Sequence, residues 1–382
     1  MHKPSSQQAD AIEKIESWID SPRGEIALAG LAGTGKTWTL SYLFEKIRAK
    51  GALVMAPTNK AAVVLRSKGV FARTIHSVLY NYSGSVVDDD GNETPVFADK
   101  DHGEVVSANR SGIFVVDEAS MVNQKQYDDI MAIAKGVLWV GDHFQLPPIG
   151  GDPEVLSCPG AMFLEEIHRQ AADNPIIRFA HALRNGSQVD RSFSDGDRLK
   201  IGGIAQDDRL IDYAEDHAIE QVIVAVNGSS VNHPGSRHRL NHLFRKQRGM
   251  KEVIEPGDRL IATFNNYRAG VFNGQLMKVT EVDSSTLGNA GVGVTVKMDD
   301  SGEEKSLVIE KDALGNPAYR SSNRLQWATQ VDYGYAITGH KSQGSQWNRV
   351  LVVDSMPPGF DAPRWRYTAS TRAAEHLSVV LR

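Results

Sequence analysis

The segment Gly30-Leu31-Ala32-Gly33-Thr34-Gly35-Lys36-Thr37 sets the architecture expected for this chain. It fits the pattern Gly-x-x-x-x-Gly-Lys-Ser/Thr of a phosphate-binding loop. Residues 25–29 before it have the pattern of a short buried strand, and residues 36–48 after it place apolar side chains on one helix face. Glycines let backbone N–H groups turn toward a phosphate, and the following helix adds the positive end of its dipole. The segment therefore predicts a nucleoside triphosphate site.

Individual positions of this loop have distinct expected roles. Gly33, Thr34 and Gly35 are expected to form the backbone cradle around the phosphates. Lys36 would reach the β- and γ-phosphates of ATP, and the Thr37 hydroxyl would bind Mg²⁺. ATP and Mg²⁺ are therefore the expected cofactors.

The composition is typical of a water-soluble globular chain. Its 382 residues exceed what one ordinary core holds, so several domains are expected. Hydrophobic residues make up 41% and charged residues 23%, and no apolar run approaches the ~18 residues of a membrane span. The only cysteine, Cys158, allows no internal disulfide. A reducing cytoplasm is therefore expected, and the compactness of the chain favours a bacterial or phage-infected host.

The net charge of −5 neither requires nor excludes a nucleic-acid partner. If nucleic acid binds, the basic groove must be local. One candidate is the run from Arg237 to Lys251, which contains six cations and no acid. A solvated helix face explains that run equally well, and both interpretations remain open.

Strand and helix patterns alternate along much of the chain. The buried strand pattern at residues 52–56 leads into a helix, and the strand at 113–116 is followed by a helix near 124–134 and a strand at 137–141. Such alternation predicts an α/β fold with a parallel sheet covered by helices on both faces. The same texture returns at residues 171–255.

Two segments interrupt this alternation. Residues 80–110 contain alternating strand patterns around an Asp-Gly turn, which predicts a β-hairpin insertion. Residues 256–326 contain four strand patterns separated by Gly, Asn and Asp, which predict a small β-barrel.

Polar residues follow two of the predicted buried strands. Asp117 and Glu118 come directly after residues 113–116, and Gln145 follows the strand at 137–141. Ligands of parallel sheets bind at the carboxyl ends of the strands. There Asp117 can hold Mg²⁺ beside Thr37, and Glu118 can orient and deprotonate the attacking water, with Gln145 sensing the γ-phosphate. Taken alone, the Asp-Glu pair would fit a solvated loop equally well.

Seven blocks, in this order, resemble superfamily 1 DNA helicases of the RecD-like subgroup, among them the bacteriophage Dda helicases. The blocks are the phosphate loop and residues 56–62, 74–77, 116–121, 166–170, 335–344 and 367–373. The resemblance spans residues 8–373. It implies two RecA-like domains, a hairpin insertion called 1B and an SH3-like insertion called 2B.

The resemblance implies further nucleotide-binding and catalytic residues. Gln8 matches the adenine reader, and Gly344 and Gln346 match positions that line the nucleotide. Arg169 and Arg372 match catalytic arginines, Arg372 being the arginine finger supplied by the second domain. Without the resemblance, a salt-bridged surface arginine would be the simpler interpretation of Arg372.

The resemblance also implies a nucleic-acid surface of hydroxyls, amides and cations, which suit sequence-independent phosphate contacts. His76 alone would more often be a structural histidine, and Phe97, a candidate for the hairpin tip that caps the duplex, could instead pack the hairpin on its own domain. The implied residues are Pro57, Thr58, Thr74, His76, Thr338, His340, Lys341, Ser342 and Phe97.

The expected domain boundaries follow from these insertions. They are residues 1–79 with 111–170 for the first RecA-like domain (1A), 80–110 for the hairpin or pin (1B), 171–255 with 327–382 for the second RecA-like domain (2A), and 256–326 for the SH3-like insertion (2B).

The family resemblance implies an ATP-hydrolysing DNA helicase that moves 5′-to-3′ on single-stranded DNA. Its expected partners are single-stranded DNA and junctions with duplex. It is expected to act as a monomer away from membranes, with a single-strand-binding or replication protein as a candidate partner. Two alternatives stay open: an RNA-directed helicase of the same superfamily, and a nucleotide-gated binding protein without processive motion.

Overall fold

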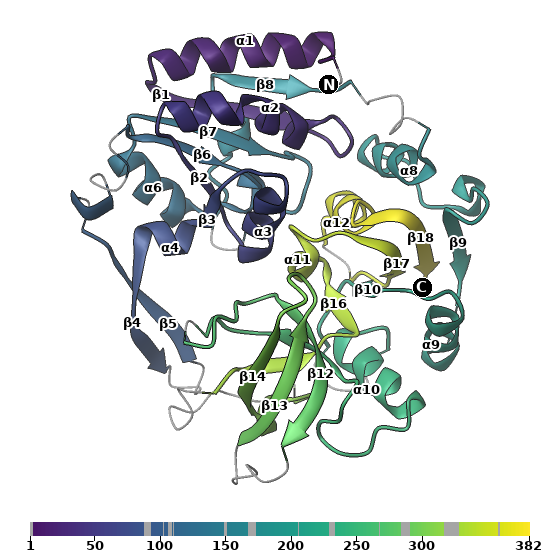
Figure 1. The fold of residues 1–382 in the computed structure, drawn as a ribbon. Coiled ribbons are helices and arrows are strands. Elements are labelled where there is room, and N and C mark those ends of the chain that lie inside the picture. The colour runs from purple at the N-terminus through teal and green to yellow at the C-terminus, as the bar shows by residue number, and fades with distance from the viewer. Residues whose placement is uncertain are drawn as a thin grey trace. The chain divides into compact units, whose positions relative to one another are not determined.

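The computed structural model describes residues 3–87, 93–101, 103–105, 109, 111–148, 151–166, 173–204, 206–228, 234–266, 268–283, 291–316, 328–357 and 360–382, with only the backbone of residues 82–87 and 93–97. The chain forms two units, Met1–Gly84 with Val96–Gly186 (unit 1), and Ser85–Pro95 with Ser187–Arg382 (unit 2). Figure 1 labels the elements of both. The expected boundary at Trp327 and the turn at residues 88–92 lie outside the described residues.

Unit 1 is built on a six-stranded parallel sheet with the strand order β3-β2-β6-β7-β1-β8. Its strands are β1 (Gly24–Gly30), β2 (Leu53–Ala56), β3 (Ala72–Thr74), β6 (Ile113–Val116), β7 (Gly136–Gly141) and β8 (Ala161–Leu164). The predicted α/β fold with a parallel sheet is confirmed here. β6 and β7 are buried along their whole length, as strands covered on both faces must be.

Helices cover both faces of this sheet. These helices are α1 (Ser6–Asp20), α2 (Lys36–Ala49), α3 (Asn59–Ser67), α4 (Ile75–Leu79) and α6 (Gln124–Ile133), and unit 1 also contains α8 (Pro175–Arg184). One apolar core joins α1, α2 and α3 to one face, and a second joins α4 and α6 to the other. Ser5 and Gln8 form a capping box at the start of α1.

β4 (Tyr80–Val87) and β5 (Glu93–Asp99) form a separate two-stranded sheet. β4 begins directly after α4, with no linker between them. This sheet lies where the sequence predicts an insertion into the α/β pattern.

Unit 2 contains a second parallel sheet, with the order β16-β10-β17-β18-β9. Its elements are β9 (Leu199–Gly203), α9 (Asp207–Asp216), β10 (Gln221–Val224), α10 (Arg237–Gln247), β16 (Ala336–Thr338), α11 (Gly339–Ser342), β17 (Trp347–Asp354), α12 (Ala362–Ser370) and β18 (Ala373–Leu381). The core combines α9 and α10 with β10, β16 and β17.

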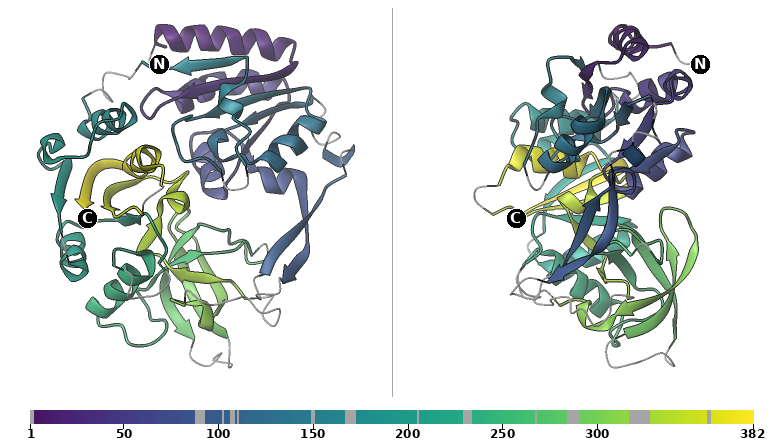
Figure 2. Two further views of the ribbon diagram at one scale, coloured as in Figure 1. Left: turned by 180° about the vertical axis from the view of Figure 1, so that it is seen from behind. Right: turned by 90° about the vertical axis from the view of Figure 1, so that its left-hand side faces the viewer.

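The strands of an antiparallel sheet lie between β10 and β16 in the sequence, although β10 and β16 are neighbours in the parallel sheet. Figure 2 shows this antiparallel sheet from two further sides. Its strands, in spatial order, are β14 (Glu304–Glu310), β13 (Gly291–Met298), β12 (Leu276–Asp283), β11 (Arg259–Ala262) and β15 (Val331–Tyr333). The four predicted strands are confirmed as β11 to β14. Just before β15, Thr329 N donates to Val308 O of β14 at 2.7 Å. This segment of the chain therefore contacts β14 at one edge of the sheet and, as β15, pairs with β11 at the other.

The described part of the chain has no helix with the length and apolar character that crossing a lipid bilayer requires.

Candidate functional site

The phosphate loop connects β1 to α2, as the sequence predicts. Gly33 and Gly35 have φ values of 82° and 83°, in the left-handed region that glycine adopts without a steric penalty. Gly30 must also be glycine, since a Cβ there would lie 2.6 Å from Thr34 Oγ1. The loop is thus curled back on itself immediately before the helix N-terminus.

Side chains within and beside the loop hold this shape. Thr34 is buried, and its hydroxyl donates to Leu31 O at 2.9 Å. Lys36 Nζ donates to the same carbonyl at 2.9 Å, so its amine lies against the loop backbone. Gln8 Nε2 donates to Thr34 O at 3.3 Å, and its Oε1 accepts from Ser5 N. The structure therefore brings Gln8 to the phosphate loop, where it also caps α1.

The predicted catalytic groups lie at the carboxyl ends of three neighbouring strands. The sheet order β6-β7-β1 places Asp117 and Glu118, Gln145 and the phosphate loop side by side along one edge. Gly141 allows this packing, since a Cβ on it would lie 3.1 Å from Ala119 N in the turn that follows Glu118.

Asp117 and Glu118 form a carboxylate pair with unusual properties. Burial of Asp117, and next the negative charge of Glu118, raise the pKa of Asp117, while the charge of Lys36 opposes that shift. Glu118 has φ 53°, a strained conformation for a residue with a side chain. Two acidic groups held together at this edge favour binding of a cation.

Gln145 has the clearest unmet hydrogen-bonding capacity at this edge. Its side chain is 6% exposed, and its Oε1 is buried without a hydrogen-bond partner. His143 Nδ1, two residues before Gln145, and Ser120 Oγ, in the turn that follows Glu118, are also buried without partners. Buried polar atoms of this kind are rare in proteins, and a bound water, ion or ligand, local strain or a catalytic role usually explains them.

Sequence reasoning missed two histidines at the site. His181 of α8 contacts Ala32 O of the phosphate loop through Nε2 at 3.4 Å, and His143 packs edge-on against Phe163 of β8. Burial is the main cause that lowers the pKa of both, so both are mainly neutral at pH 7. His143 could have been found from its place in the block around Gln145, whereas nothing local marks His181.

Asp117 and Thr37 are suitable ligands for a Mg²⁺ site in which the protein supplies only a few of the ligands. A carboxylate and a hydroxyl are oxygen donors, which Mg²⁺ prefers, and nucleotide phosphates usually complete its coordination. Across the described ranges, no group of three or more His, Cys, Asp or Glu side chains is arranged to hold a metal ion without such help.

In unit 2 the structure brings Arg372, Gly344 and Gln346 together at the end of the parallel sheet where β17 and β18 begin. Arg372 Nε donates to Thr368 O at 3.0 Å and Nη1 donates to Ser345 O at 3.3 Å. The guanidinium is buried, which differs from an exposed, salt-bridged arginine. Arg169 lies outside the described residues.

The nucleic-acid candidates of unit 1 continue along the same strand-end edge as the nucleotide groups. Pro57 and Thr58 follow β2, Thr74 ends β3, and these strands lie beside β6. Thr58 and Thr74 are the N-caps of α3 and α4, each accepting from a backbone N–H at 3.1 Å. Burial lowers the pKa of His76, on the first turn of α4, so it is mainly neutral at pH 7. The side chain of Phe97 lies outside the described residues.

The candidates of unit 2 gather on α11, directly after β16. Thr338 is the N-cap of α11, Ser342 is buried, and the Lys341 amine contacts Asn273 of the antiparallel sheet segment. Burial, with a smaller contribution from the charge of Arg237, lowers the pKa of Lys341 to about 8. Burial also lowers the pKa of His340.

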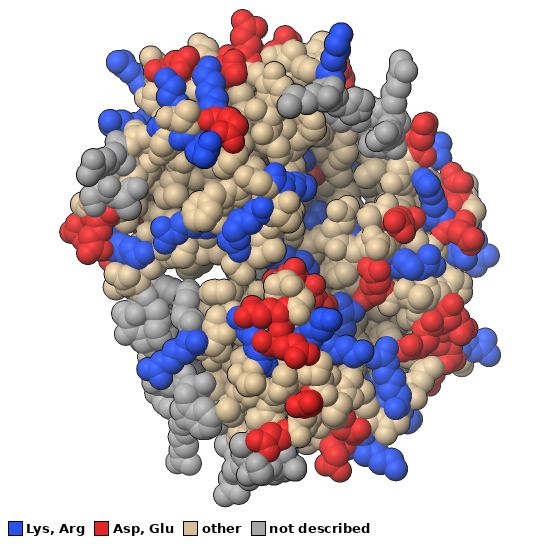
Figure 3. Space-filling view, in the orientation of Figure 1, with Lys and Arg blue, Asp and Glu red and all other residues tan. Residues whose placement is uncertain are grey.

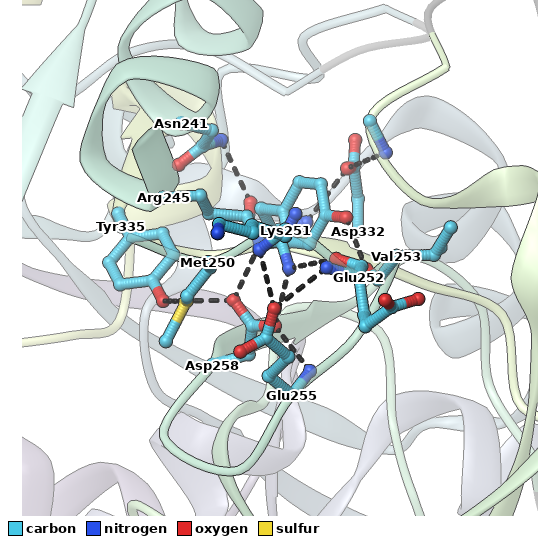
Figure 4. Close-up of polar contacts among 12 residues, drawn as sticks. Asn241, Arg245, Met250, Lys251, Glu252, Val253, Glu255, Asp258, Asp332 and Tyr335 are labelled. Carbon is cyan, nitrogen blue, oxygen red and sulfur yellow. Dashed lines mark hydrogen bonds and ion pairs between the residues drawn. The ribbon is translucent and has the colours of Figure 1, made fainter. Parts of the chain in front are cut away.

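The four arginines in the basic run from Arg237 to Lys251 form ion pairs within unit 2. Acidic side chains pair with all four of them, and Figure 4 shows Arg245 and Tyr335 converging on Asp258. The pairs are Arg237–Asp332, Arg239–Asp207, Arg245–Asp258 and Arg248–Glu215. Figure 3 shows acidic and basic side chains interspersed across the described part of the face that it presents. This run is therefore not a ready-made groove for nucleic acid.

Comparisons with known proteins extend these observations. The family model described as "AAA domain" matches residues 3–203, just over half of the chain, and the model described as "UvrD-like helicase C-terminal domain" matches residues 333–380. The ATP-dependent RecD2 DNA helicase of Deinococcus radiodurans is 27% identical over 394 residues, covering 98% of this chain and 49% of the relative. The ATP-dependent DNA helicase Dda of Enterobacteria phage T4 is 25% identical over 262 residues, covering 63% of this chain and 56% of the relative.

The chain thus spans about half the length of these two relatives. Among solved structures, Pif1 helicase from Bacteroides in complex with ADP-AlF3 and single-stranded DNA is similar in fold. Its TM-score is 0.59 at 20% identity, covering 100% of this chain and 92% of that one. With the strand-end site described above, these matches confirm the resemblance to RecD-like superfamily 1 helicases, phage Dda among them, that is predicted from the sequence. The chain belongs to the family described as "AAA domain".

Proposed function

We propose that this chain is an ATP-driven DNA helicase that moves 5′-to-3′ along single-stranded DNA and unwinds the duplex ahead of it. The observation that supports this best is the single edge of the unit 1 sheet, along which nucleotide and nucleic-acid candidates follow one another in the order Thr74, Thr58, Asp117, Gln145 and phosphate loop. Adjacent sites on one rigid sheet let a change at the nucleotide alter the grip on the strand. The names of the RecD2, Dda and Pif1 relatives agree with this activity.

In the proposed chemistry, the loop backbone and Lys36 hold the β- and γ-phosphates. Glu118 orients the attacking water and accepts its proton, and Gln145 contacts the γ-phosphate. Thr37 and Asp117 would hold Mg²⁺, which when bound neutralises charge on the phosphates. Arg372 of unit 2, and Arg169, would stabilise charge on the transferring phosphoryl group.

In the proposed nucleic-acid interface, caps and first turns of short helices meet the phosphates of the strand. Thr58, Thr74 and Thr338 each lie at a helix N-terminus, which favours anionic groups. Contacts of this kind do not depend on base identity. We therefore expect binding that is nearly independent of sequence.

The finer architecture is also part of this proposal. We infer two RecA-like domains, a strand-separating pin at residues 80–110 and an SH3-like barrel at residues 256–326. The hydrogen bonds of Thr329 with β14 support closure of the barrel. A monomeric, cytoplasmic protein acting at junctions of single-stranded and duplex DNA fits this arrangement.

The direct test is strand separation with ATP and Mg²⁺, using DNA duplexes that carry a 5′ or a 3′ single-stranded tail. We expect unwinding with the 5′ tail only, and none by Lys36→Ala, which loses the phosphate contact. Lys50→Ala, an exposed lysine at the end of the same helix, is the matched control.

Other outcomes would identify the alternatives. Unwinding of RNA but not DNA duplexes would indicate an RNA-directed helicase. Binding of single strands that ATP modulates, without unwinding of either duplex, would indicate a nucleotide-gated binding protein.

A further inference from the structure

The β4–β5 sheet is attached to unit 1 at a closely packed root. Tyr80, the first residue of β4, follows the last residue of α4 directly, and Lys100 N donates to Leu79 O at 2.8 Å where the chain returns from β5. Lys100 Nζ also donates to Ser77 O at 2.7 Å, placing a cation at the carboxyl end of α4. The two strands therefore leave unit 1 as extensions of α4.

Tyr80 is buried at this root and anchors it to a second helix. Its side chain is 7% exposed, and its hydroxyl donates to Asp129 Oδ2 of α6 at 2.5 Å. Burial first, and the bond to Asp129 next, raise the pKa of the Tyr80 phenol, so the hydroxyl keeps its proton and remains a donor. A short hydrogen bond to a carboxylate is among the stronger kinds in proteins.

Lys125 of α6 ties both strands to the same helix. Its amine contacts Asp129 at 2.7 Å and Asp99, the last residue of β5, at 3.0 Å, and lies 5.0 Å from the centre of the Tyr80 ring. Lys125 is exposed, so these ion pairs add little to stability. Their geometry nevertheless fixes the beginning of β4 and the end of β5 to one turn of α6.

The root also touches a residue proposed to contact nucleic acid. The His76 ring lies 5.3 Å from the Tyr80 ring, centre to centre. His76 belongs to α4, whose N-cap is Thr74. His76 therefore connects α4, which begins at the proposed strand contact Thr74, to Tyr80, and Tyr80 connects to Asp129 at the root of the two-stranded sheet.

We propose that Tyr80 is a positioning residue for strand separation, which holds the root of the β4–β5 sheet against α6 through its bond to Asp129. This inference rests on the proposed helicase function and on the β4–β5 segment being its separating element. Tyr80 is not among the residues assigned to the nucleotide site or to the strand. Its hydroxyl is therefore expected to affect how much duplex is opened for each ATP hydrolysed, and not the rate of hydrolysis.

The test is Tyr80→Phe, which removes the hydroxyl and keeps the ring that packs against His76. We expect ATP hydrolysis stimulated by single-stranded DNA to stay within about twofold of the parent, and base pairs unwound per ATP to fall about tenfold, the order expected for one charge-assisted hydrogen bond. The matched control is Tyr127→Phe on the same helix, which removes a hydroxyl that donates to Glu25 at 3.3 Å. It should change neither quantity.

Asp129→Asn provides a second variant. The amide oxygen can still accept from Tyr80, whereas the charge that attracts Lys125 is lost, so unwinding per ATP should remain closer to the parent than in Tyr80→Phe. Equal unwinding per ATP by Tyr80→Phe and the parent would overturn the inference. Absence of unwinding by the parent would instead overturn the helicase proposal, so the two failures are distinguishable.

Discussion

The side chain of Gln145 lowers the stability of the fold, and the contact with the γ-phosphate proposed above would explain why it is retained. Its buried Oε1 lost contact with water on folding and gained no partner in exchange. A buried acceptor in that state costs roughly 1–3 kcal/mol. Natural proteins retain such a cost chiefly at sites where a ligand satisfies the atom.

We therefore predict opposite effects of Gln145→Met on stability and activity. Methionine keeps the approximate volume and removes the unpaired oxygen, so the free energy of unfolding should rise by about 1 kcal/mol. ATP turnover should fall by ~10-fold or more, because a contact to the γ-phosphate is lost. Thermal unfolding and steady-state ATPase assays measure the two; a less stable, fully active variant would contradict the role given to Gln145.

Arg372 is the second residue with a separable role. As a finger it acts mainly in the transition state, so Arg372→Ala should lower kcat by ~10³ or more, while nucleotide affinity changes much less. Arg364→Ala on α12, the helix that ends two residues before Arg372, removes a partly exposed arginine and is the control. Nucleotide titration together with ATPase assays distinguishes the cases: equal losses of affinity and turnover would make Arg372 a uniform binder.

The lowered pKa of Lys341 predicts that affinity for single-stranded DNA depends on pH. Its pKa of about 8 means that the amine loses its charge as pH rises through that value, and a bound phosphate would move this window upward. Affinity for single-stranded DNA should therefore fall between pH 7 and pH 9 in the parent and fall less in Lys341→Arg, which stays charged. Fluorescence anisotropy at constant ionic strength measures this, and identical profiles would remove Lys341 from the interface.

At the scale of elements, α11 depends on a glycine. A Cβ on Gly339 would lie 2.5 Å from Trp365 Nε1 of α12, a fully buried side chain, so only glycine allows the helix its present position. The candidates Thr338, His340 and Lys341 all depend on that position.

Gly339→Ala should therefore destabilise unit 2 by about 1–3 kcal/mol, the usual cost of overpacking, and weaken binding of single-stranded DNA. Gly202→Ala is the matched control, since a Cβ there meets no atom within 4 Å. Denaturant unfolding and DNA titration measure the two effects. Unchanged DNA affinity in a destabilised Gly339→Ala variant would separate α11 from the interface.

At the scale of the whole molecule, a net charge of −5 excludes binding by general electrostatic attraction. The arginines of α10 do not supply a basic groove, because they are ion-paired. Binding must therefore depend on a few local contacts.

A small, countable number of phosphate contacts predicts a shallow salt dependence. Lys341→Ala should lower the slope of log K against log [salt] by about one unit, as for the loss of one neutralised phosphate. Lys278→Ala on β12 should leave the slope unchanged, because that lysine is exposed outside the proposed interface. Titrations at several salt concentrations provide the measurement, and equal slopes for both variants would argue against a phosphate contact by Lys341.

The amino-acid pattern alone was enough to place the phosphate loop, the Asp117-Glu118 pair, four strands of the first parallel sheet (β1, β2, β6 and β7) and four strands of the antiparallel sheet (β11 to β14). These features depend on contiguous residues: a loop binds phosphate through successive backbone N–H groups, and a buried strand shows as an apolar run. Local patterns of this kind survive in a single sequence.

Other features exist only once the chain has folded. Asp207 pairs with Arg239 across 32 positions and Asp258 with Arg245 across 13, so no periodicity reveals that the basic run is neutralised. The same holds for the contact of His181 with Ala32, 149 positions apart, and for the bond from Tyr80 to Asp129. Side-chain pairing between distant segments is set by strand order and helix packing, and these depend on the energy of the whole core, to which every local pattern contributes only a part.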